Sequence, residues 1–168
     1  MRRLLLVVML VLGLATAVGQ QQHVWRGATA SELEAVLPMR APVEKERIET
    51  EMRTATGVID EQKRIIASVV LITAGYSADG KYSHFLVVQA PWRLGELKLK
   101  AGTYVVGWTR VPDGLKVRIY DALTGVERGE VKAVPIGPGG RVESFRIWAP
   151  GEHKYVQIGR FMLAYSFE

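Results

Sequence analysis

TYVVGWTRVPDGLKVRIYD, residues 103–121, is the stretch that decides the fold. Two runs rich in β-branched and aromatic residues, 103–110 and 115–121, flank a Pro-Asp-Gly segment that supplies the backbone angles of a turn. Apolar residues occupy alternate positions of the second run, namely Leu115, Val117 and Ile119. A period of two is typical of a strand with one face in the core, so the stretch predicts a β-hairpin.

Similar runs extend outward from this hairpin, separated by Gly or Pro turns at intervals of roughly 8–12 residues. The predicted strands are 64–73, 82–89, 94–100, 103–110, 115–121, 127–134, 142–148, 154–160 and 161–167. We therefore predict an all-β fold, a small antiparallel β-sandwich or barrel of about eight or nine short strands.

Three local features refine this prediction. The run 64–73 is too apolar for a half-exposed strand and is expected at the centre of the sheet. Asp79-Gly80 is the dipeptide of a two-residue type I′ hairpin, which would join 64–73 to 82–89. The segment from Leu99 to Tyr104 predicts a corner in which the tyrosine hydroxyl pins a turn.

The N-terminus predicts export. Arg2-Arg3, an apolar core over 4–14 and a small-residue segment around Ala17 and Gly19 describe a signal peptide over 1–19, with cleavage after either residue. The apolar run is shorter than the roughly 20 residues that cross a bilayer, so no stable membrane insertion is expected after cleavage. An extracytoplasmic location, periplasmic or secreted, follows.

Residues 20–46 form a leader ahead of a β-domain over 47–168. Ser31 and Glu34 have capping-box spacing, which predicts a short helix that Pro38 stops. The pattern over 42–56 agrees with either a helix or a strand with one wet face, and its threonines slightly favour the strand. Residues 20–62 carry a net charge of −3 (five bases, eight acids), and 63–168 carry +6 (fifteen bases, nine acids). The acidic segment is expected to lie against the basic one.

Composition and spacing give no catalytic site. The chain has no cysteine, which excludes disulfides and thiol chemistry. His23, His84 and His153 are isolated, so neither a metal site nor any other cofactor is predicted, and the histidines are expected at the surface or rim. Glu49 and Glu51 share one strand face, where an ion-paired, solvated edge is the expectation. The basic residues alternate with apolar ones along strands, so no nucleic-acid binding is predicted.

Aromatic residues beside turns are the remaining candidates. Trp92, Trp148 and Tyr155 flank Pro or Gly turns, where rigid side chains can grip a ligand at low entropic cost. Of the two tryptophans, Trp148 is the one expected to be core, since it ends a strand whose Phe145 and Ile147 point inward. The sequence predicts an exported, non-catalytic β-domain, a binding or envelope-associated module for a protein, glycan or small apolar ligand. A barrel that carries an apolar ligand, or an enzyme of unfamiliar type, are the alternatives.

Overall fold

The computed structural model describes residues 24–168, which form one α-helix and thirteen β-strands. The signal peptide predicted over 1–19 and its two cleavage sites lie outside the described residues. The elements are β1 (Trp25–Gly27), α1 (Ala30–Val36), β2 (Arg40–Val43), β3 (Glu46–Asp60), β4 (Ile65–Leu71), β5 (His84–Val88), β6 (Trp92–Leu94), β7 (Leu97–Leu99), β8 (Gly102–Val111), β9 (Gly114–Asp121), β10 (Glu127–Pro135), β11 (Glu143–Ile147), β12 (Tyr155–Gly159) and β13 (Phe161–Phe167).

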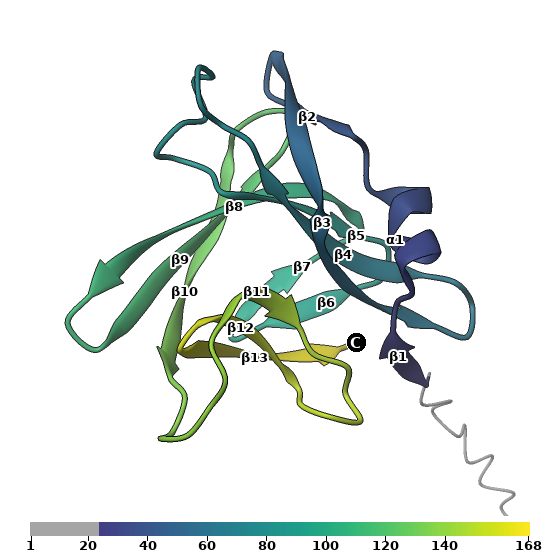
Figure 1. The fold of residues 1–168 in the computed structure, drawn as a ribbon, viewed down its shortest axis with the longest axis vertical. Coiled ribbons are helices and arrows are strands. Elements are labelled where there is room, and N and C mark those ends of the chain that lie inside the picture. Colours follow the sequence, from purple (N-terminus) through teal and green to yellow (C-terminus); the bar gives the residue numbers. More distant parts are fainter. Residues whose placement is uncertain (1–23) are drawn as a thin grey trace, which may run out of the picture.

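One antiparallel sheet runs in the order β1-β3-β4-β5-β8-β9-β10-β13-β12-β11 and curls so that its two ends approach each other (Figure 1). The predicted all-β, antiparallel fold is confirmed, but the expected eight or nine strands are too few. Three of the additional strands come from residues 25–60. A fourth arises because the run 94–100 breaks at Gly95, whose φ of 58° reverses the chain and pairs Leu94 with Leu97.

Two hydrophobic cores lie on opposite faces of the sheet. The inner core fills the curl with large side chains, among them Trp92, Phe145, Phe161 and Tyr165. The outer core lies between β3–β5 and the segments that cover them, α1, β2 and the loop 72–83. Strand β4 contributes to both cores, and it lies between β3 and β5. This double burial explains its continuous apolar run and confirms its central position.

Residues 25–43, which the sequence sets apart as a leader, are built into this body. β1 pairs with the end of β3, and α1 buries Leu33 in the outer core. The helix ends at Val36, ahead of Pro38, but its N-cap is Thr29 and not Ser31. The Thr29 hydroxyl accepts from the Glu32 N–H (3.3 Å), and the Glu32 carboxylate accepts from the Thr29 N–H (2.9 Å). The capping box therefore begins two residues earlier than predicted.

Residues 42–56 are extended, as their threonines suggested. β2 and β3 form a hairpin in which Val43 pairs with Glu46, and Glu44 takes the positive φ (51°) of the two-residue turn. Ile48 is fully buried in the outer core, while Arg47 beside it is exposed. This alternation is that of a strand with one solvent-exposed face, which the sequence pattern allowed.

The prediction of a two-residue hairpin at Asp79-Gly80 is wrong. Residues 72–83 form a longer loop between β4 and β5, in which Gly80 has a positive φ (72°) but Asp79 does not. The Lys81 N–H donates to the Ala78 carbonyl (3.0 Å), and Ala78 and Tyr82 are buried against the outer face of the sheet. The loop is long because it covers a face that would otherwise be an exposed apolar surface.

Other local predictions hold. The Tyr104 hydroxyl donates to the Lys100 carbonyl (2.7 Å), which confirms the corner between β7 and β8. The alternating residues of β9 point inward and are buried, as are Phe145 and Ile147 on β11. Of these strands, β11 borders the candidate site, and Phe145 and Ile147 are part of its lining.

Candidate functional site

The two ends of the curled sheet meet at a seam that is not closed by strand pairing. On the edge of β3 away from β4, β1 pairs with residues 58–60 and β2 with residues 46–49. Strand β11 lies opposite the stretch between them, and within the described chain β11 pairs only with β12. One side-chain bond crosses the seam: the Ile147 N–H donates to the Thr56 hydroxyl (3.2 Å).

Both strands bulge where they face the seam. The pairing of β3 with β4 shifts between Glu51 and Thr56, and that of β11 with β12 shifts between Glu143 and Arg146. The Thr54 side chain fills the first bulge, since its hydroxyl donates to the Glu51 carbonyl (2.7 Å) and accepts from the Val70 N–H (3.0 Å). Bulges bend strands and end regular pairing, so two opposed bulges hold the strands apart.

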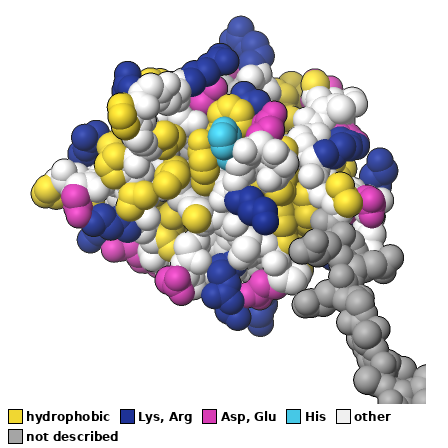
Figure 2. Space-filling view, turned by 90° about the horizontal axis from the view of Figure 1, so that it is seen from below, with side chains coloured by type: hydrophobic (Ala, Val, Ile, Leu, Met, Phe, Trp, Pro, Cys, Tyr) yellow, Lys and Arg dark blue, Asp and Glu magenta, His cyan; other side chains and the backbone are white. Residues whose placement is uncertain are grey.

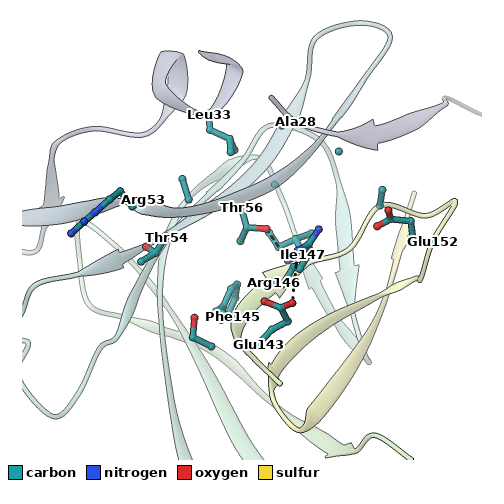
Figure 3. Close-up of a pocket in the computed structure, with 15 residues that line it drawn as sticks. Ala28, Leu33, Arg53, Thr54, Thr56, Glu143, Phe145, Arg146, Ile147 and Glu152 are labelled. Atoms are coloured by element: carbon teal, nitrogen blue, oxygen red, sulfur yellow. Dashed lines mark hydrogen bonds and ion pairs between the residues drawn. The ribbon is translucent and has the colours of Figure 1, made fainter. Parts of the chain in front are cut away.

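The result is a cleft of about 500 Å³, called here the seam cleft, which β3 and β11 line together with the end of β1 and one residue of α1 (Figure 3). Many of its side chains are small or carry a hydroxyl group. The small and hydroxyl residues are Gly27, Ala28, Ala55, Gly57, Thr54, Thr56, Ser144 and Ala149. Leu33, Phe145 and Ile147 are the large apolar residues of the lining. Because the walls are short, ligand atoms can approach the backbone closely.

Charged side chains also line the seam cleft. Arg53 is largely exposed and pairs with Glu51 (3.0 Å), and this partner holds the pKa of the Glu51 carboxyl below its usual value. Glu143 lies near Arg141 (3.2 Å) and Arg146 (3.8 Å). Its Oε1 atom is buried and hydrogen-bonded to neither guanidinium. Both guanidiniums lie near this same oxygen, so Glu143 belongs to the lining as an ion-paired carboxylate.

A cluster of aromatic and cationic side chains continues from the seam cleft along the β11–β12 hairpin. This rim cluster consists of Arg146, Trp148, His153 and Tyr155. The Arg146 guanidinium lies 4.1 Å from the centre of the Trp148 ring, and His153 stacks on Tyr155 at 4.9 Å. Figure 2 views the molecule from the side of this hairpin and shows hydrophobic side chains gathered among lysine and arginine side chains.

The rim cluster rests on a buried glutamine. The Trp148 indole N–H donates to Gln157 Oε1 (3.0 Å), while the Gln157 amide donates to the carbonyls of Arg141 and Gly159. The Tyr165 hydroxyl donates to the Trp148 carbonyl. These bonds hold the half-buried Trp148 in one position, so the cluster is a preorganised surface.

Two of the three residues predicted to bind a partner meet in this cluster, Trp148 and Tyr155. Trp92 does not, and the expectation that it is exposed is wrong, since only 1% of it is accessible. It lies on β6, which pairs with β13, and it packs in the inner core against Tyr165. The expectation that Trp148 is the more buried tryptophan is therefore also wrong.

His84 is a residue whose environment the sequence did not reveal. It was expected at the surface or rim, but it is 5% exposed, stacks on Phe145 (4.4 Å) and packs at a tilt against Trp108 (5.3 Å). Its Nδ1 lies 3.0 Å from the Ser83 hydroxyl, and its Nε2 has no hydrogen-bond partner. Burial lowers the pKa of His84 to about 4. A neutral imidazole thus supports Phe145, the aromatic residue in the lining of the seam cleft.

The glutamates of β3 form an ion-paired edge, as predicted. Glu49 accepts from the Tyr76 hydroxyl (2.5 Å) and from Arg40, and these bonds, the tyrosine first, lower its pKa to about 2. Its neighbour on this face, Glu51, pairs with Arg53. Over residues 24–168, no three histidine, aspartate or glutamate side chains gather as a metal site would require.

Comparisons with protein-family models, with curated proteins and with solved structures find no match. Among residues 24–168 the helix has seven residues, so no helix there is long and apolar enough to cross a membrane.

Proposed function

We propose that this protein is an exported, non-catalytic binding module that uses the seam cleft and the rim cluster as its contact surface. The observation that carries the proposal is the open seam, where two opposed bulges keep β3 and β11 from pairing. Bulges of this kind are over-represented at barrel rims and beside functional sites. The preorganised rim next to it offers contact area at low entropic cost.

The alternatives have less support. A carrier of an apolar ligand needs an internal cavity of a few hundred cubic ångströms, whereas large side chains fill the inner core. An enzyme needs an acid, base or nucleophile poised in its cleft. The carboxylates near the seam cleft are paired with arginines, which is the arrangement of a structural ion pair.

The test is a binding screen with matched variants. The mature protein is screened against a displayed library of random peptides and against a glycan array. Ser144→Trp fills the seam cleft from an exposed position, and Ser166→Trp adds the same side chain at an exposed position of β13 outside it. We expect a ligand whose binding Ser144→Trp abolishes and Ser166→Trp preserves, at unchanged melting temperature. A ligand unaffected by Ser144→Trp, or no ligand in either screen, would refute the proposal.

Export is tested separately. N-terminal sequencing of the protein recovered from its native cell should begin at Val18 or Gln20, since these residues follow the two predicted cleavage sites. Recovery of membrane-bound protein that still begins at Met1 would contradict it.

A further inference from the structure

We propose that the ligand of the seam cleft is an extended polypeptide segment, which adds to the free edge of β11 as an antiparallel or parallel strand. This inference rests on the proposed function and specifies its partner. Addition of a strand to an exposed sheet edge is a general mode of peptide recognition, in which main-chain hydrogen bonds supply the affinity.

The backbone N–H of Ile147 points toward the edge of β11 to which a strand would be added. The Trp148 N–H donates to the Tyr155 carbonyl, toward β12, whereas the Ile147 N–H donates across the seam to Thr56. Polar groups of alternate residues point to the same edge only in a regular strand, and the pairing of β11 with β12 shifts between Glu143 and Arg146, so this direction is established at Ile147. In place of a neighbouring strand, Ile147 has only a hydroxyl group, which a peptide carbonyl can replace.

The opposite wall leaves room for a chain. The bulge of β3 turns residues 52–55 away from regular pairing, and the wall beside it consists of Ala55, Gly57 and the Gly27-Ala28 segment. A side chain at Gly57 would collide with β4, since a Cβ there would lie 2.6 Å from the Ile66 carbonyl oxygen. The close approach of β4 therefore explains Gly57, while Gly27, Ala28 and Ala55 keep the lining short on the side of the cleft.

The lining also defines the side chains that such a segment would carry. Alternate residues of an added strand would face Phe145 on the inner side of the sheet, and those between them would face the outer side, where Leu33, Arg53 and Arg146 line the cleft. Both guanidiniums already have a carboxylate nearby, so the apolar contacts dominate selection. We expect segments of about five residues, the length of β11, with apolar side chains at every second position.

The test uses a peptide selected from the displayed library and synthesised with one N-methyl group at each position in turn. Removal of an N–H that bonds to β11 should weaken binding about tenfold, and removal of an N–H that faces away from it should not, so sensitivity should recur with a period of two. On binding, the Ile147 amide should become more protected from hydrogen exchange. Ser144→Trp should abolish binding of this peptide, and Ser166→Trp should leave its affinity unchanged.

Other occupants give different results. If ligands are found on the glycan array alone and Ser144→Trp abolishes their binding, the peptide assignment is overturned. The proposed function as a binding module is then still supported. A selected peptide whose N-methyl scan shows no period of two would overturn strand addition in the same way. Self-association through β11 without peptide binding, detected as dimers that Ser144→Trp abolishes, would replace the peptide by a second copy of this chain.

Discussion

His84 makes the stability of this domain depend on pH in a calculable way. Its pKa is about 4 in the folded protein, against about 6.5 in the unfolded chain, because burial between Phe145 and Trp108 disfavours the imidazolium. The unfolded state therefore binds the proton more tightly, and stability falls as pH decreases from 6.5 toward 4. Linkage gives a loss of about 2 kcal/mol between pH 7 and pH 5, and about 3 kcal/mol by pH 4.

The perturbation is His84→Phe, which keeps a ring in the stack and removes the titrating group. Urea unfolding at several pH values gives the free energy of unfolding of the wild type and of the variant. Carboxylates contribute equally to both proteins, so the difference between the two curves isolates His84. We expect the wild type to lose about 2 kcal/mol more than the variant between pH 7 and pH 5.

The matched control is His153→Gln, since His153 is exposed in the rim cluster. Its pH curve should run parallel to that of the wild type. Parallel curves for wild type and His84→Phe would show that His84 is solvated in the folded protein, and the reasoning from burial would fail.

The other predictions concern stability and are read from chemical or thermal unfolding. Trp92→Ala should lower the free energy of unfolding by about 3–5 kcal/mol, because it truncates a core side chain. Trp148→Ala should lower it by about 1–2 kcal/mol, chiefly because the buried Gln157 oxygen loses its donor. Equal losses in the two variants would contradict the assigned burial. Tyr104→Phe should cost about 1 kcal/mol through the lost bond of the corner, and no change would show that bond to be unimportant. Gly80→Val should cost about 1–2 kcal/mol, since its Cβ meets no atom but its φ is positive; a neutral variant would place the turn elsewhere. Thr56→Val should cost about 1 kcal/mol and speed exchange of the Ile147 amide, whereas unchanged exchange would mean that another group closes the seam.

Interactions and backbone preferences of residues close in the sequence determined much of this fold. Alternation placed Leu115, Val117 and Ile119 in the core, and the corner at Tyr104 followed from its own six residues. Gly and Pro mark most chain reversals because few other residues tolerate the dihedral angles of a turn. Even where the turn type at Gly80 was wrong, its positive φ was foreseen, since that property belongs to the residue.

The environment of each strand face was decided only by the tertiary structure. Trp92 and Trp148 have similar sequence neighbourhoods, each within two residues of a proline, yet β13 covers the first and leaves the second half-buried on a rim. His84 lies on a strand whose inner face meets Phe145, far away in sequence.

The candidate site is the clearest case. The bond from Ile147 to Thr56 joins residues 91 positions apart, and it exists because the sheet curls until its ends meet. Each bulge depends on how a strand aligns with its partner, a relation that no single segment contains. The sequence by itself determined the strands from residue 64 onward, apart from the break at Gly95, and the apolar faces of β9 and β11. The seam, its cleft and the free edge of β11 come from the closure of the sheet, because an unpaired edge is a property of two strands that fail to meet.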